Sequence, residues 1–264
     1  LPVFRSDPLG SVAYATEQIV LVLGLGGLAM LTLTPWLAVA VVALLVVVVA
    51  SYRQTCYAYP DGGGAYAVSR RNLGVRAGLV AASALLVDYV LTVAVSVVAG
   101  VAAITSAIPG LVPHAVALSV AFVVLLTVVN LRGTKESGRA FAVPTYGFVA
   151  IVLALLVVGG VRLALGQDIA AESADYGLIP DHRTGGLLTV FLALRAFASG
   201  CTALTGVEAV SNGVPSFQPP KARNAAITLT VMGGLAITMF AGITALAVAT
   251  HVHMAENPDL LIGL

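Results

Sequence analysis

The stretch Ser199-Gly-Cys-Thr-Ala-Leu-Thr-Gly-Val-Glu-Ala209 places two glycines and a carboxylate inside an apolar segment long enough to cross a membrane. An acid at the centre of a membrane helix costs about 2.5–3.5 kcal/mol on insertion scales, so it usually lines an ion pathway or a binding site. The glycines weaken the helix at the same place. The stretch therefore predicts a membrane helix that is interrupted near Ser199–Gly206, with Glu208 beside the break.

The composition of the whole chain supports this membrane assignment. The 264 residues are 59% hydrophobic and 9% charged, whereas soluble domains carry about 25% charged residues. The apolar runs are also far longer than the roughly ten residues of a membrane β-strand. We therefore predict an all-α integral membrane protein whose partner is the lipid bilayer. The net charge of +1 gives no reason to expect nucleic acid as a partner.

Seven apolar segments approach the roughly 20 residues that a spanning helix needs. They are Ser11–Leu31, Pro35–Ala50, Ala77–Ile104, Pro113–Leu131, Phe141–Leu165, Leu187–Asn212 and Ala225–Thr250. The loops after the second, fourth and sixth segments carry most of the arginines and lysines, and these loops are cytoplasmic by the positive-inside rule. We expect a multi-pass protein of the cytoplasmic (inner) membrane with its N-terminus inside. The polar residues 166–186 then form an external loop.

The first span opens with Ser6-Asp-Pro-Leu-Gly-Ser11, in which a proline and a glycine predict a second interruption near Asp7–Ser11. The two predicted breaks lie five spans apart, as in a five-plus-five inverted repeat whose broken helices build a site at the membrane midplane. On this interpretation residues 1–165 form a first five-helix repeat. Residues 187–264 begin the second repeat.

A second intramembrane acid, Asp88, lies with Tyr89 in the third span. Asp88, Thr92 and Ser96 recur every four residues and share one helical face. We expect Asp88 and Glu208 to face a common cavity between the first, third and sixth spans. Carboxylate, hydroxyl and freed carbonyl oxygens at such a place suit a small cation. Two alternatives stay open: Asp88 bonds only to a neighbouring helix, and the threonines serve only helix packing.

Several motifs, in the same order, resemble those of the amino acid–polyamine–organocation (APC) permeases, in particular the branch of KimA-type bacterial potassium–proton symporters. These motifs are Ser6 to Glu17, Tyr59-Pro-Asp-Gly-Gly-Gly-Ala-Tyr66, Asp88-Tyr-Val-Leu-Thr92, Asn130-Leu-Arg-Gly133 and Thr202 to Gly213. The resemblance covers nearly the whole chain. It implies the LeuT-type inverted-repeat transporter fold, truncated here after about seven transmembrane helices.

The resemblance also implies roles for particular residues. Those that would bind or surround the ion are Asp88, Tyr89, Thr92, Thr205 and Glu208, with Thr92, Thr205 and Glu208 as ligands. Asp7 and Tyr14 would belong to the ion or proton path. The implied function is proton-coupled potassium uptake, with an amino acid–proton or cationic amine–proton permease as the alternative. Asp7 and Pro8 favour a cation, because an acid and a missing amide disfavour the carboxylate of an amino acid. A homodimer is left open.

Other classes of function find no support in the motifs. The chain has no Thr-Val-Gly-Tyr-Gly filter of a potassium channel and no hydrolase or metalloprotease signature, so we do not expect an enzyme, a cofactor or a transition-metal site. Gly62-Gly-Gly64 lacks the Lys-Ser/Thr of a phosphate-binding loop, and Gly24-Leu-Gly-Gly27 is placed inside a span. The first run is predicted to lead into a short cytoplasmic helix around Ala65–Asn72.

Overall fold

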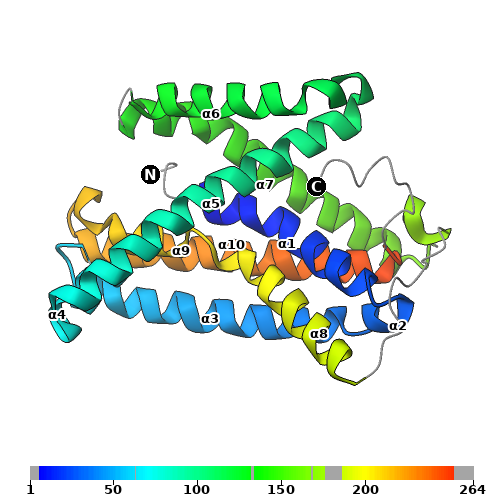
Figure 1. The fold of residues 1–264 in the computed structure, drawn as a ribbon, viewed down its shortest axis with the longest axis horizontal. Coiled ribbons are helices and arrows are strands. Elements are labelled where there is room, and N and C mark those ends of the chain that lie inside the picture. The colour runs from blue at the N-terminus through cyan, green and yellow to red at the C-terminus, as the bar shows by residue number, and fades with distance from the viewer. Residues whose placement is uncertain (1–5, 63, 132–133, 168, 176–185, 253–264) are drawn as a thin grey trace.

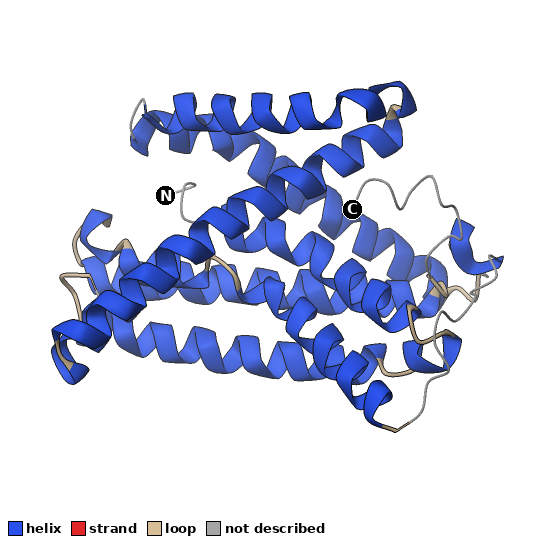
Figure 2. Cartoon of the chain, in the orientation of Figure 1, coloured by secondary structure: helices blue, strands red, loops and turns tan. Residues whose placement is uncertain are grey.

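The computed structural model describes residues 6–62, 64–131, 134–167, 169–175 and 186–252, without the side chains of residues 6–8, 134–141, 172 and 175. The described residues form helices and loops, and no strand occurs among them (Figure 2). In the first half of the chain the α-helices are α1 (Ser6–Gly24), α2 (Leu28–Leu31), α3 (Thr34–Ala58), α4 (Ala65–Leu73), α5 (Val75–Ala107), α6 (Ala115–Leu131) and α7 (Thr134–Ala164). In the second half they are α8 (Leu187–Gly200), α9 (Val207–Asn212) and α10 (Lys221–Ala249).

Four short 3-10 helices complete the described chain. They are η2 (Pro109–His114), η3 (Glu172–Asp175), η4 (Cys201–Leu204) and η5 (Val214–Ser216). The short helix predicted around Ala65–Asn72 is present as α4, and its cytoplasmic side stays a prediction.

Six helices, or runs of consecutive helices, in the described part of the chain are long and apolar enough to cross a membrane. They are Leu28–Ala58, Val75–Ala107, Pro109–Leu131, Ala142–Ala164, Leu187–Asn212 and Lys221–Ala249. The all-α membrane class predicted from the sequence is confirmed. The first predicted span is shorter than expected, because its apolar helix covers Leu9–Gly24 only. The second is longer, since α3 continues past Ala50 to Ala58.

The interruption predicted near Asp7–Ser11 is wrong: α1 runs unbroken through these residues. Pro8 is the third residue of α1, where backbone amides have no intrahelical partner, so its missing N–H costs no hydrogen bond. The chain breaks later instead. α1 ends at Gly24, and Gly27 takes a φ of 83° before α2 begins. The run Gly24–Gly27, which the sequence places inside the first span, therefore ends α1.

The hydrophobic core joins helices that are far apart in sequence. Its buried residues come mainly from α1, α3, α8, α9 and α10, and Figure 1 shows α10 running alongside α3 beneath α1. α5 crosses this bundle diagonally and leads to α6 at its edge, and α7 then runs back across the bundle and packs against α10 (Figure 1). α6 has no buried residue, and α5 has only Gly78, Val97 and Val101. The fold is thus a tight five-helix core with a loosely attached arm.

Small residues allow the closest helix contacts in this core. A Cβ atom added to Gly200 would lie 2.6 Å from Cδ1 of Ile19, so α1 and α8 approach each other as closely as a glycine permits. A Cβ atom at Gly233 of α10 would similarly lie 2.7 Å from Cγ2 of Val49 on α3. Such contacts are typical of membrane helices, where van der Waals packing drives association. The contact between Gly200 and Ile19 holds α8 against α1 at the end of α8.

Candidate functional site

The interruption predicted near Ser199–Gly206 is confirmed. α8 ends at Gly200, η4 follows, and Thr205 has an extended backbone with φ −62° and ψ 142°. Gly206 then takes the left-handed conformation, with φ 80° and ψ −9°, and α9 begins at Val207. A side chain would make this conformation costly, so the glycine fixes where the helix restarts. At the break, the backbone N–H and C=O groups do not follow the hydrogen-bonding pattern of a continuous α-helix.

Glu208 lies in the first turn of α9, directly after the break. Its side chain is 8% exposed, so the carboxylate is enclosed by protein. A carboxylate in the first turn of a helix interacts favourably with the partial positive charge of that end. Ser211, three residues further along α9, is also buried. The break therefore presents a buried acid at the start of a short helix.

Three hydroxyl groups connect α1 to the same break. Oγ1 of Thr205 lies 2.8 Å from Oγ of Ser11 and 2.8 Å from the carbonyl oxygen of Thr202. The hydroxyl of Tyr14 donates to Ser11 Oγ at 3.2 Å. Ser11 is buried, whereas Tyr14 and Thr205 are half-buried, so the cluster is partly enclosed between α1 and η4. Tyr14 and Thr205, which the sequence proposed separately, thus meet through Ser11.

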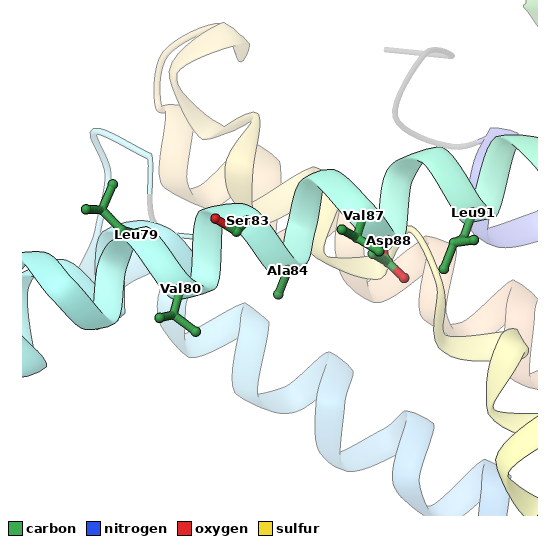
Figure 3. Close-up of a pocket in the computed structure, with 7 residues that line it drawn as sticks. All are labelled: Leu79, Val80, Ser83, Ala84, Val87, Asp88 and Leu91. Atoms are coloured by element: carbon green, nitrogen blue, oxygen red, sulfur yellow. The ribbon is translucent and has the colours of Figure 1, made fainter.

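The third helical segment of the site is α5. Asp88, Thr92 and Ser96 are each half-buried, whereas Val87 and Val90 beside them are exposed, so the shared face turns toward the protein. Asp88 lines a hollow along α5 together with Leu79, Val80, Ser83, Ala84, Val87 and Leu91 (Figure 3). Glu208 does not line this hollow, and a cavity common to both acids stays a prediction.

An electrostatic interaction with α3 and a hydrogen bond with α9 link Asp88 and Tyr89 to the surroundings of Glu208. Tyr52 on α3 is close enough to interact electrostatically with Glu208, Tyr89 and Asp88. The hydroxyl of Tyr89 accepts a hydrogen bond of 2.9 Å from Nδ2 of Asn212, the last residue of α9. The structure therefore gathers one acid from α5, one from α9 and a tyrosine from α3.

Two of the predicted residues are not placed in these contacts. The side chain of Thr92 makes no hydrogen bond to another described side chain or backbone group, although it lies on the same face as Asp88. The side chain of Asp7 lies outside the described residues.

Three residues that the sequence did not propose as site residues belong to the contacts: Ser11, Tyr52 and Asn212. Ser11 and Asn212 lie within the quoted motifs, so their position beside proposed residues was the available signal. Tyr52 had no such signal, because it lies outside the quoted motifs.

The arrangement has the chemistry of a cation site. Carboxylate, hydroxyl and backbone carbonyl oxygens are hard ligands, and hard cations prefer oxygen. A break in a membrane helix adds carbonyls that can replace the water around an ion. An anionic substrate would meet Glu208 and Asp88 in the same region, which opposes its binding.

Comparisons with known proteins identify the family of the chain. A family model described as amino acid permease matches residues 3–262. The chain is 49% identical over 248 residues to the potassium transporter KimA of Bacillus subtilis (strain 168). The alignment covers 94% of this chain and 40% of that relative, so the chain spans about two fifths of the relative's length. From the match along nearly its whole length, this membrane protein belongs to the amino acid permease family.

Proposed function

We propose that this chain is part of a secondary transporter that takes up potassium together with protons across the cytoplasmic membrane. In this proposal Thr205, Glu208 and Thr92 bind the ion, with Asp88 and Tyr89 as its neighbours. Asp7 and Tyr14 belong to the path of the ion or proton. The seven predicted spans remain one five-helix repeat and the start of a second.

The observation that carries the proposal is the break between α8 and α9. It places a buried carboxylate, Glu208, three residues from Thr205, whose hydroxyl already contacts Ser11 of α1. A cation bound at the break would lie beside this carboxylate and interact favourably with its charge. A proton on Glu208 would do the same when the ion leaves, which offers a physical basis for coupling the two.

An amino acid or cationic amine–proton permease is the second candidate, since the family model carries the description amino acid permease. Carriers that receive a substrate carboxylate use free amides at the N-terminus of a half-helix. Here α1 is unbroken and an acid occupies the first turn of α9. Both features oppose a free carboxylate, whereas a cationic amine remains compatible with them.

The proposed orientation puts the N-terminus and α4 in the cytoplasm. Arg70 and Arg71 lie on α4, and Lys221 and Arg223 begin α10; α4 and the start of α10 lie toward the same end of the molecule (Figure 1). Basic residues favour the cytoplasmic side. The exposed apolar faces of α5 and α6 are compatible with contact with lipid in this proposal, and a homodimer is left open.

The test is uptake of ⁸⁶Rb⁺ by the full-length protein in a bacterial strain that lacks its own potassium uptake. We expect growth at low potassium and uptake that external protons stimulate. Radiolabelled amino acids and a polyamine are measured in parallel. Accumulation of one of these without rescue at low potassium would replace the potassium assignment by the second candidate.

A further inference from the structure

Asn212, the last residue of α9, connects three separate parts of the chain. Its Nδ2 donates to the hydroxyl of Tyr89 on α5 at 2.9 Å. Its Oδ1 lies against Gly64, the residue before α4, because a Cβ atom built on Gly64 would be only 1.3 Å from it. One side-chain amide therefore touches α5 on one side and the loop between α3 and α4 on the other.

The glycine at position 64 is explained by this contact. Gly64 has φ −65° and ψ −180°, which any residue adopts, so its backbone does not require glycine. Gly62, by contrast, has φ 108°, and a Cβ atom there would also lie 3.3 Å from Cγ of Pro215. The loop thus lies directly on the end of α9 and the start of η5.

Tyr59, at the start of this loop, contacts two residues of α4. Nδ2 of Asn72 donates to the hydroxyl of Tyr59 at 2.7 Å, and the guanidinium of Arg71 lies 5.4 Å from the centre of the Tyr59 ring. α4 in turn packs along the start of α5. A movement of α4 would therefore carry the loop with it. It would pull Gly64 away from Asn212.

Asn212 also lies close to the proposed ion site. It follows Glu208 by four residues, so the two side chains share one face of α9. Its partner Tyr89 directly follows Asp88. The Asn212–Tyr89 hydrogen bond thus crosses from α9 to α5 at the end of the molecule where α4 lies (Figure 1).

We infer that Asn212 is a positioning residue that fixes the hydroxyl of Tyr89 beside the proposed ion site and holds Gly64, the residue before α4, against the end of α9. This inference rests on the proposed function. It assigns to Asn212 a coupling between the proposed site and the contact of Gly64 with α9. When Gly64 leaves α9, Asn212 is free to turn and Tyr89 loses this donor.

The first test measures ⁸⁶Rb⁺ uptake by the full-length protein. Asn212→Leu keeps the branched shape and removes the hydrogen bond. We expect the KM for rubidium to rise about five-fold, the effect of one lost hydrogen bond, with a smaller change in the maximal rate. Tyr89→Phe should raise KM similarly, and the double variant should be no worse than either single one. Asn224→Leu is the control, because Asn224 bonds only to the carbonyl of Gln218 at an exposed site.

The second test needs no transported substrate. Cys56 on α3 is fully buried and lies beside Ser211, the neighbour of Asn212. In inside-out vesicles of full-length protein in which Cys56 is the only cysteine, we expect Asn212→Ala to raise the rate at which N-ethylmaleimide labels Cys56 several-fold. Gly64→Ala should do the same by displacing the Asn212 amide. In the Gly64→Ala/Asn212→Ala protein the added methyl meets no amide, so the labelling rate should equal that of Asn212→Ala.

The outcomes separate this inference from the proposed function. If the unmutated protein takes up no rubidium, the proposed function is wrong, while the labelling experiment still decides whether Asn212 holds Gly64 against α9. Unchanged labelling in Asn212→Ala, or additive effects of Gly64→Ala and Asn212→Ala, would overturn this holding role. An unchanged rubidium KM in Asn212→Leu would overturn the positioning of Tyr89.

Discussion

At the scale of single residues, the charge of Glu208 is the feature on which the proposed transport depends most. In the full-length protein we expect Glu208→Gln to lower ⁸⁶Rb⁺ uptake at least about ten-fold, because interactions with a charged group contribute about 1.5–3 kcal/mol. Gln keeps the shape and can form hydrogen bonds, so the amount of folded protein in the membrane should not change. Uptake and membrane content are measured on the same cells.

The matched control for this variant is Glu17→Gln, since Glu17 lies on α1 with an exposed side chain. It should leave uptake within about two-fold of the unmutated protein. Equal losses of uptake in both variants would mean that the burial of Glu208 beside the break has no special role.

Thr205 offers a second prediction at the residue scale. Thr205→Ala removes the hydroxyl that contacts Ser11 and Thr202, so the variant should lose one oxygen of the proposed site and the bond to α1. We expect a rise of roughly five- to ten-fold in the KM for rubidium. Thr92→Ala should raise it less, because Thr92 makes no hydrogen bond within the described residues. Thr238→Ala is the control, since Thr238 bonds only within α10.

At the scale of elements, α1 and α8 approach each other closely at Gly200, the last residue of α8. Gly200→Val should destabilise the protein by about 1–3 kcal/mol, because its side chain would overlap Ile19 in a packed core. Thermal unfolding in detergent, followed by the loss of the monodisperse peak in size-exclusion chromatography, measures this effect. Gly160→Val on α7 is the control, since nothing lies within 4 Å of a Cβ atom there. Equal midpoints for the two variants would contradict the importance of this contact.

At the scale of the whole molecule, the orientation in the membrane can be tested from the two ends. Leu73 is the last residue of α4 and is 76% exposed, whereas Leu165 follows α7 and is 71% exposed. In a cysteine-free full-length protein, a membrane-impermeant maleimide should label Leu165→Cys in intact spheroplasts. Leu73→Cys should react only after the membrane is opened. The reverse pattern would invert the proposed topology.

The sequence predicted those parts of the fold that depend on local properties. Long apolar runs fixed the membrane class, and Gly206 beside Glu208 located the break between α8 and α9. The same reasoning failed at α1, because the effect of Pro8 depends on where the helix begins, and the local sequence does not show that position. A proline interrupts a helix in its interior, but in the first turn it removes no hydrogen bond.

By itself, then, the sequence determined an all-α membrane protein of the amino acid permease type, with the acids Asp88 and Glu208 in apolar segments and with one of its two predicted helix breaks, near Ser199–Gly206. Only the tertiary structure decided which side chains meet. Ser11 contacts Thr205 across 194 positions, and Asn212 contacts Tyr89 across 123. The physical reason is that lipid and protein interior are equally apolar, so hydropathy does not show which face of a membrane helix turns inward. That rotation is set by close contacts such as Gly200 with Ile19 and Gly64 with Asn212, and these exist only once the helices have packed.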